Sequence, residues 1–242
     1  MIHSNIFIRR SLAPCGRSGL KSRFYLKKSM ANKTLSTPAA QRFYDRIGSR
    51  YDWFEFYEGR AKERAQEALQ LAPGHKLLSV GVGTGKELRQ MLDTITPGGT
   101  AFGLDISPVM LNLTRDRTSA PVCQGDARQL PYASQSFVRL YAAYVLDLLP
   151  YADLPGLISD FHRVIRPGGM AVILALTEGI DLPSRALVAA WKGIFSLSPT
   201  VCGGCRPLEL LDLVRQAGFT KVEREVVVQL GVPSEIITAT TT

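Results

Sequence analysis

The sequence is poor in the residues on which metal centres and membrane spans depend. Its 242 residues include three histidines and four cysteines. The one close pair of cysteines has neither a second pair nor a histidine nearby, so a four-ligand zinc site is not expected. No apolar run approaches the roughly 20 residues of a membrane-spanning helix. We therefore expect no metal site, and we expect any contact with a membrane to be peripheral.

Acidic residues are absent from the first 44 residues, which contain nine lysines and arginines. The other 198 residues contain the remaining 20 basic residues and all 21 acidic residues. The formal net charge of +8 therefore comes from the N-terminal segment, and the body of the chain is close to neutral. Domains that bind nucleic acid carry clustered positive charge, so we expect no nucleic-acid partner.

The basic segment, residues 1–33, has the composition of an organelle transit peptide. It combines arginines with scattered serines and a few apolar residues, and it has no acidic residue. We expect import into the mitochondrion, with a plastid as the alternative. If Met30 were the true start, this leader would be missing and the protein would be cytoplasmic.

The clearest motif is a glycine-rich turn. An apolar run at 77–82 predicts a buried parallel strand, and a helix-like pattern follows Lys86. Gly81, Gly83 and Gly85 lie between them, in the strand–turn–helix arrangement that holds adenosine-containing cofactors. A dinucleotide fingerprint, G-x-G-x-x-G, would need its third glycine at position 86. The observed G-x-G-x-G spacing instead resembles motif I of class I S-adenosylmethionine (SAM) dependent methyltransferases.

Two acidic residues end the next two expected strands. Asp105 closes the strand at 101–106 and lies 20 residues beyond Gly85, where an acidic side chain accepts hydrogen bonds from both ribose hydroxyls. An alternative role for Asp105 is to cap the following helix, but Ser107, which precedes a proline, can fill that role. Asp126 follows a third short strand within a Gly-Asp-Ala sequence.

Further segments resemble the ubiquinone/menaquinone biosynthesis methyltransferase family. Residues 43–52 are similar to its F-D-x-I-A-x-x-Y-D segment, residues 103–111 to G-x-D-x-S-x-x-M-L, and residues 163–169 to the R-V-L-K-P-G-G turn of the superfamily. The resemblance covers residues 40–240 and implies that the cofactor is SAM. It also implies cofactor contacts from Tyr51, Gly81, Val82, Gly83, Gly85, Asp105, Ile106, Asp126 and Ala127.

By the same resemblance, Tyr51 would face SAM, Asp126 would accept a hydrogen bond from the adenine amine, and the Ala127 N–H would donate to the adenine ring. For Tyr51 the pattern has a second interpretation. Together with Phe43 and Ile47 it forms an apolar stripe at helical spacing, so its role could be packing alone.

The chain departs from the family at two positions. Ser79 stands where the family usually has an acidic residue that organises the methionine end of SAM, and Val138 replaces an acidic residue after Phe137. A serine still forms hydrogen bonds, so we expect SAM to bind with a weaker pull on its ammonium group. The serine at position 79 leaves open a second interpretation, in which the protein is a catalytically silent SAM-binding assembly or scaffold factor. A nicotinamide oxidoreductase is a third interpretation, which Lys86 disfavours.

Methyl transfer from a sulfonium is an in-line displacement, for which positioning alone can supply ~7–11 kcal/mol. Neither a metal nor a covalent nucleophile is required, but an aromatic carbon acceptor would also need a base. Tyr51, Tyr144 and Asp147 are the candidate catalytic residues, together with Tyr44, and the sequence does not choose among them.

The alternation of strands and helices predicts an α/β fold, a Rossmann-like doubly wound seven-stranded mostly parallel sheet with an antiparallel C-terminal strand pair. We expect the methyltransferase domain to span residues 34–242. It would include an N-terminal helical lid at 36–70, a substrate-cap insert at 177–206 and a helix from 207 to 217.

The insert contains the pair Cys202 and Cys205 around two glycines. We interpret it as a glycine-rich loop with two free thiols, in preference to a zinc or redox site. The expected acceptor is a small or lipid-like molecule, first a prenylated quinol and second a phospholipid head group. These motifs contain no signal for the oligomeric state.

Overall fold

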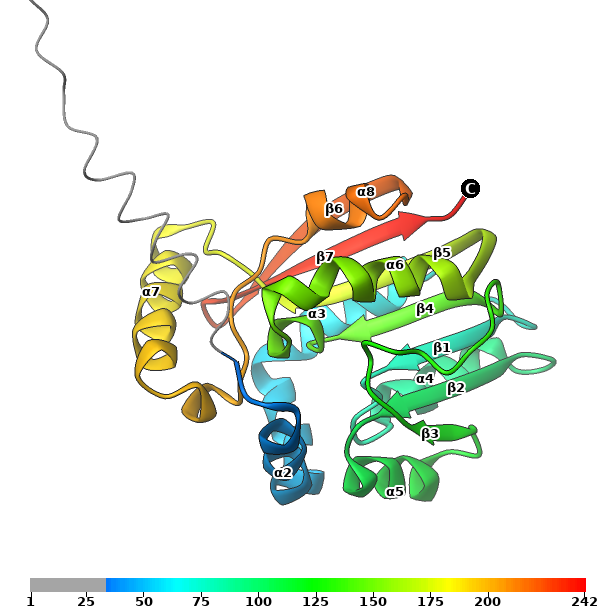
Figure 1. The fold of residues 1–242 in the computed structure, drawn as a ribbon, viewed down its shortest axis with the longest axis horizontal. Coiled ribbons are helices and arrows are strands. Elements are labelled where there is room, and N and C mark those ends of the chain that lie inside the picture. The colour runs from blue at the N-terminus through cyan, green and yellow to red at the C-terminus, as the bar shows by residue number, and fades with distance from the viewer. Residues whose placement is uncertain (1–33) are drawn as a thin grey trace, which may run out of the picture.

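A seven-stranded sheet forms the centre of the computed structural model, which describes residues 34–242 (Figure 1). The strand order is β3-β2-β1-β4-β5-β7-β6. Neighbours from β3 to β5 pair in parallel, whereas β7 is antiparallel to both β5 and β6. This confirms the predicted fold. The strands are β1 Lys76–Val80, β2 Thr100–Asp105, β3 Val122–Gln124, β4 Phe137–Ala143, β5 Ile165–Leu176, β6 Thr220–Gln229 and β7 Val232–Thr240.

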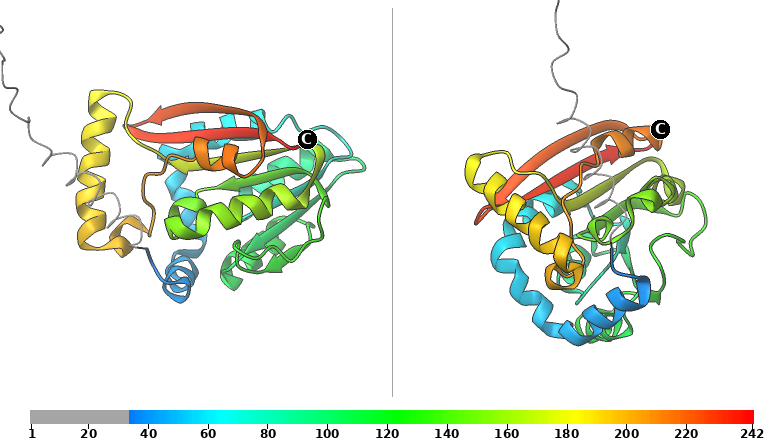
Figure 2. Two further views of the ribbon diagram at one scale, coloured as in Figure 1. Left: turned by 45° about the horizontal axis from the view of Figure 1, so that its top comes forward. Right: turned by 60° about the vertical axis from the view of Figure 1, so that its left-hand side comes forward.

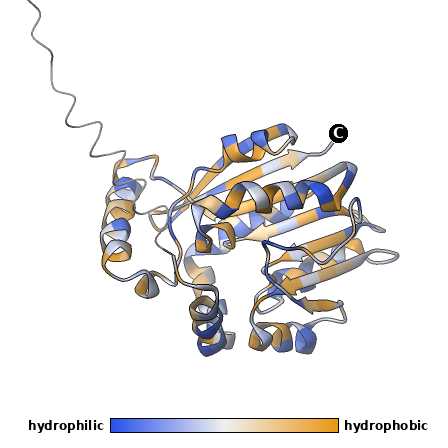
Figure 3. Ribbon diagram, viewed as in Figure 1, coloured by the Kyte–Doolittle hydropathy of each residue, from blue (hydrophilic) through white to orange (hydrophobic). Residues whose placement is uncertain are grey.

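Helices cover both faces of the sheet, which makes the fold doubly wound. Buried side chains of α6 and α8 pack with one face, and those of α3, α4 and α5 pack with the other. The central strands are hydrophobic along most of their length, while the helices alternate between hydrophobic and hydrophilic residues (Figure 3). The helices are α2 Thr37–Ile47, α3 Glu55–Ala68, α4 Lys86–Ile95, α5 Pro108–Arg117, α6 Leu154–Val164, α7 Leu182–Leu197 and α8 Leu211–Gln216.

Within the described part of the chain, four short 3-10 helices connect these elements: η1 Gly48–Phe54, η2 Leu146–Leu148, η3 Tyr151–Asp153 and η4 Pro199–Cys202. Both α2 and α7 lie beyond the end of the sheet toward which the arrows of β2 and β4 point (Figures 1 and 2). The carboxyl ends of the parallel strands therefore face these two helices. Within residues 34–242, no helix has the length and apolar character needed to cross a membrane.

The predicted helix at 207–217 is wrong in its first half. Helix α8 begins only at Leu211, because the preceding residues extend alongside the end of β5. The Leu208 N–H donates to the Leu176 carbonyl at 2.8 Å, and the Leu210 N–H donates to the buried carboxylate of Glu235 at 2.8 Å. The first bond belongs to a parallel bridge between Thr177 and Leu208, which keeps Leu208 extended and outside the helix.

The insert at 177–206 contains a full helix, α7, followed by η4. The α7 N-terminus is capped reciprocally, with the Asp181 carboxylate accepting from the Ser184 N–H at 2.8 Å. Cys202 and Cys205 are free thiols. The predicted transit peptide, residues 1–33, lies outside the described residues.

Candidate functional site

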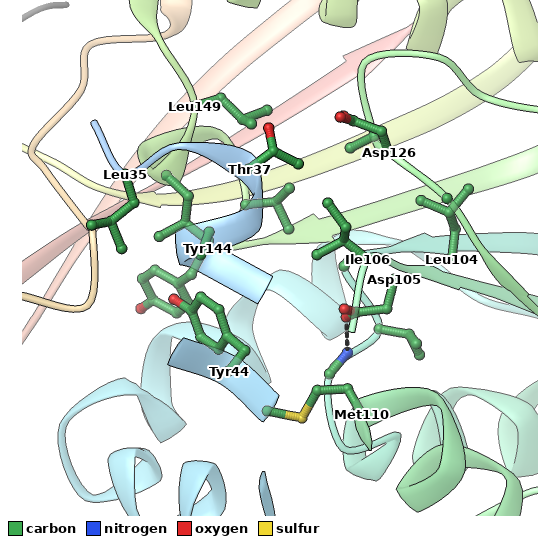
Figure 4. Close-up of a pocket in the computed structure, with 18 of the residues that line it drawn as sticks. Leu35, Thr37, Tyr44, Leu104, Asp105, Ile106, Met110, Asp126, Tyr144 and Leu149 are labelled. Carbon is green, nitrogen blue, oxygen red and sulfur yellow. Dashed lines mark hydrogen bonds between the residues drawn. The ribbon is translucent and has the colours of Figure 1, made fainter. Parts of the chain in front are cut away.

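A cavity of about 320 Å³ opens at the carboxyl ends of β1 to β4, between the sheet and the N-terminal segment (Figure 4). Ligands of open α/β sheets bind at this edge. Ten predicted site residues line the cavity: Tyr44, Tyr51, Gly81, Val82, Gly83, Asp105, Ile106, Asp126, Ala127 and Tyr144. Two predicted site residues, Gly85 and Asp147, are outside its lining.

The glycine turn serves two different purposes. A Cβ added to Gly85 would lie 2.8 Å from the Cα of Thr114, so this glycine allows α4 and α5 to pack closely. At Gly83, a Cβ would meet nothing closer than 4.0 Å, because the position faces the open cavity. Both residues have positive φ, which L side chains rarely adopt. Gly83 therefore leaves space for a ligand, and Gly85 positions the helix behind it.

Asp105 is held at the edge of the cavity by two backbone groups. Its Oδ2 accepts from the Gly83 N–H and its Oδ1 from the Ser107 N–H, each at 2.9 Å. Burial raises the pKa of Asp105, although these hydrogen bonds oppose the rise. Each carboxylate oxygen keeps a further lone pair, so both can accept from vicinal hydroxyls. The Ser107 hydroxyl accepts from the Met110 N–H and so caps the N-terminus of α5, as predicted.

Asp126 is bound by an arginine that the sequence analysis missed. The Arg128 Nε lies 3.0 and 3.1 Å from the two carboxylate oxygens, and this hydrogen bonding lowers the pKa of Asp126. Arg128 also donates to Asp153 at 3.0 Å and to Thr37 at the start of α2 at 2.7 Å. No sequence signal marks these contacts, because Thr37 lies 91 residues away along the chain.

Three further polar contacts hold the N-terminal segment over the cavity. The Ser107 hydroxyl donates to Asp45 of α2 at 2.5 Å. Asp52 of η1 accepts from Arg117 at 2.7 Å and from Thr84 at 2.6 Å. With the contact between Arg128 and Thr37, they connect α2 and η1 to the loops after β1, β2 and β3. The segment therefore forms one wall of the cavity, with Leu35, Thr37 and Tyr44 facing it in Figure 4.

We expect Arg128→Gln to loosen this wall with only a small loss of stability. Arg128, Asp126 and Asp153 are each about one-third exposed, and such pairs contribute about 0–1 kcal/mol. Hydrogen exchange of backbone amides in 37–54 should therefore accelerate by up to about fivefold, the factor that corresponds to 1 kcal/mol. Arg215→Gln is the matched control, because Arg215 pairs with exposed Asp212 on α8, away from this wall. Equal exchange in the two variants would contradict the prediction.

Aromatic side chains form the end of the cavity beyond the glycine turn. Tyr44 donates to the Gly203 carbonyl at 3.3 Å, and the Tyr144 hydroxyl lies 2.8 Å from that of Ser234. Burial raises the pKa values of Tyr44, Tyr51 and Tyr144 well above the usual value. All three therefore stay protonated at neutral pH, and they can donate hydrogen bonds and exclude water more readily than they can accept a proton.

Asp147 lies behind the cavity wall. Its side chain is fully buried in η2, and its Oδ2 accepts from the Leu176 N–H at a long 3.5 Å. Its Oδ1 has no hydrogen-bond partner among the described residues. Burial raises the pKa of Asp147 to about 7, which the nearby charge of Arg206 only partly opposes. Among the predicted catalytic residues it is the one whose titration falls near neutral pH.

Comparison with known proteins identifies the class to which this site belongs. Residues 77–169 match the family described as "Methyltransferase domain". The chain is 31% identical over 175 residues to the methyltransferase GfsG of Streptomyces halstedii, covering 68% of this chain and 59% of that protein. It is 30% identical over 150 residues to the ubiquinone/menaquinone biosynthesis C-methyltransferase UbiE of Bordetella parapertussis, covering 54% of each.

An uncharacterised methyltransferase of Synechocystis, sll0829, is 29% identical over 168 residues, covering 69% of this chain and 77% of that protein. The chain thus spans about half to three quarters of the length of these curated relatives. Many solved structures share the fold, and two of them are described next. A putative methyltransferase from Haloferax volcanii, solved with the Trm112 activator, has a TM-score of 0.67 at 18% identity and covers 84% of this chain and 97% of its own.

The second structure is a phosphoethanolamine N-methyltransferase from Haemonchus contortus, with a TM-score of 0.63 at 15% identity, covering 86% of this chain and 60% of its own. The chain contains a class I SAM-dependent methyltransferase domain and is a distant relative of the ubiquinone/menaquinone enzymes among others. The family implies SAM as the methyl donor. The cavity fits SAM, since it combines an open position at Gly83 with carboxylates from β2 and the loop after β3.

Proposed function

We propose that the protein transfers a methyl group from SAM to a small or lipid-like acceptor. The observation that supports this proposal is a cavity in which the glycine turn and the carboxylates of Asp105 and Asp126 continue into a buried aromatic end. In the bound state SAM supplies a methyl group on a positively charged sulfonium. Residues 36–70 would act as a lid, and the insert at 177–206 would cap the acceptor.

The residues of the cavity have separate tasks in this proposal. Asp105 would orient the ribose through its two oxygens, and Asp126 with the Ala127 N–H would bind the adenine. Tyr44 and Tyr144 would exclude water from the reacting end. Such positioning in a dry site can supply ~7–11 kcal/mol of the barrier to an in-line displacement.

For the acceptor we propose a prenylated quinol first and a phospholipid head group second. Relatives named as demethylmenaquinone methyltransferase and as UbiE support the first choice. The second choice is motivated by chemistry shared with the name of the Haemonchus contortus structure, since phosphoethanolamine is also the polar part of a phospholipid head group. The apolar side of the cavity, formed by Leu35, Leu148 and Leu149, suits an acceptor with an apolar portion.

Methyl transfer from isotopically labelled SAM into an organelle lipid extract tests this proposal. We expect one labelled product, whose mass identifies the acceptor class. Calorimetry with SAM and with NAD(H) should be run first, because binding of NAD(H) alone would overturn the methyltransferase proposal. Binding of SAM without any labelled product would favour a second function, a silent SAM-binding assembly or scaffold factor. The motivation for that alternative is Ser79, which leaves the end of β1 without a carboxylate.

We also propose that residues 1–33 direct the protein to the mitochondrion. The absence of acidic residues among these basic and serine-containing residues supports this proposal. A fluorescent protein fused after residue 33 should enter mitochondria, and a matched fusion of residues 30–33 alone should remain in the cytoplasm. Accumulation of the first fusion in plastids, or diffuse fluorescence from both fusions, would contradict the mitochondrial assignment.

A further inference from the structure

Three charged side chains are buried together beside the glycine turn. The Lys62 Nζ lies 3.1 Å from the Oε2 of Glu58, one turn away on α3, and 3.1 Å from the Oε1 of Glu87 in the first turn of α4. The side chains of Lys62 and Glu58 are 5% and 8% exposed, and that of Glu87 is 19% exposed. Withdrawing such charges from water costs several kcal/mol per ion before they pair.

The charges in this group do not balance. Two carboxylates surround one ammonium group, which leaves one excess negative charge when both are ionised. Burial by itself would lower the pKa of Lys62, but the charges of Glu87 and Glu58 outweigh it and raise the pKa. Lys62 therefore stays charged, and its ammonium group also lies 5.1 Å from the centre of the Tyr51 ring. One further cation would neutralise the group.

Only one of the three side chains borders the cavity. Glu87 lines it, whereas Glu58 and Lys62 stand behind. The hydroxyl of Tyr141 is also buried here and has no hydrogen-bond partner among the described residues. The carboxylates of Glu87 and Glu58 act on it electrostatically and contribute to its raised pKa, after the effect of burial. Glu87 therefore presents a carboxylate at the cavity surface. Behind it lies a buried cluster of polar side chains whose hydrogen bonds are incomplete.

The strand order determines which part of a ligand would meet Glu87. From β3 to β4, the carboxyl edge presents Asp126, Asp105, the glycine turn and Tyr144 in turn. An adenosine whose base and ribose lie against the two aspartates would direct its 5′ substituent across the glycine turn. Glu87 lies at that side of the cavity, in the helix that follows the turn.

We propose that Glu87, supported by the ion pair of Lys62 and Glu58, binds the α-ammonium group of the amino-acid tail of SAM. This inference rests on the proposed function and names a residue that selects the cofactor. It also accounts for Ser79, which is buried in β1 opposite Tyr141 and does not line the cavity. The carboxylate is supplied from α4 and no acidic side chain is needed at the end of β1.

Truncated ligands separate this role from general effects on the cavity. S-adenosylhomocysteine carries the amino-acid tail, whereas 5′-methylthioadenosine has the same nucleoside without it. We expect Glu87→Gln to weaken binding of S-adenosylhomocysteine by about 10- to 100-fold, the usual range for a hydrogen bond to a charged group. Its affinity for methylthioadenosine should stay within twofold of that of the unmodified protein. Both affinities are measured by calorimetry.

Two further variants control the experiment. Glu63→Gln removes an exposed carboxylate from α3 and should leave both affinities unchanged. Glu87→Asp keeps the charge and should restore part of the lost affinity, which also distinguishes the role from a failure to fold. A deaminated analogue of S-adenosylhomocysteine should bind the unmodified protein and Glu87→Gln equally well.

The possible results have distinct meanings. Equal weakening of both ligands by Glu87→Gln would overturn the inference, because it would show a general loss of the cavity. Unchanged affinity for S-adenosylhomocysteine would also overturn it, although the proposed function would stand. If neither ligand bound the unmodified protein, the proposed function itself would fail.

Discussion

Replacing Asp105 with asparagine is expected to weaken binding of S-adenosylhomocysteine by about 100-fold. The side chain accepts one backbone N–H on each oxygen and keeps a lone pair on each for a ribose hydroxyl. Asparagine retains one acceptor and places an amide donor where the other oxygen was. One ribose hydroxyl then loses a charged acceptor and the second loses its acceptor altogether, at about 1.5–3 kcal/mol for a charged hydrogen bond.

The same substitution should also cost about 1–3 kcal/mol of unfolding free energy, because one of the buried N–H groups of Gly83 and Ser107 would face a donor. Calorimetry gives the affinity, and urea unfolding shows that the variant is folded under the binding conditions. Asp116→Asn, which changes an exposed carboxylate on α5, is the control. An unchanged affinity in Asp105→Asn would mean that this carboxylate does not contact the nucleoside.

The second large effect is on the pH dependence of stability, and it depends on Asp147. The carboxyl group has a pKa of about 7 in the folded protein, against an ordinary value of 3.8. Between these values the folded state holds a proton that the unfolded state has lost. The free energy of unfolding should therefore fall as pH rises from 4 to 7, by up to about 1.4 kcal/mol per pH unit from this group.

Asp147→Asn should remove this contribution, because an amide does not titrate. The variant and the unmodified protein should have similar stability near pH 4, where the carboxyl group is neutral in both states. At pH 8 the variant should be more stable by several kcal/mol. Urea unfolding at pH 4.5 and pH 8 measures the difference, with exposed Asp93→Asn as the control. A stability difference that is the same at both pH values would contradict the assignment.

The strands and the glycine turn could be predicted from the sequence because their signals are local. An apolar run followed by glycines at alternate positions specifies β1 and the start of α4 within about ten residues. Asp105 could be predicted in the same way, because it ends the next strand and lies 20 residues beyond Gly85. The parallel order of β1 and β2 then brings both to one edge.

The connections between distant segments could not be predicted. Arg128 bonds to Thr37 across 91 positions, and Asp52 bonds to Arg117 across 65. Each is an ordinary charged or hydroxyl residue that would suit a solvated surface equally well. The helix expected from 207 failed for a related reason, because Leu208 and Leu210 bond to β5 and to Glu235 on β7.

The sequence by itself determined the class of fold and the edge of the sheet that carries the candidate site, because both depend on hydrophobic period and on glycine, whose effects act within a few residues. Only the tertiary structure decided that Gly85 serves helix packing and that Asp147 is buried behind the cavity. It also decided that Glu87 reaches the cavity beside Lys62. These roles depend on which side chains face one another after the chain has folded, and burial and charge pairing then set their chemistry.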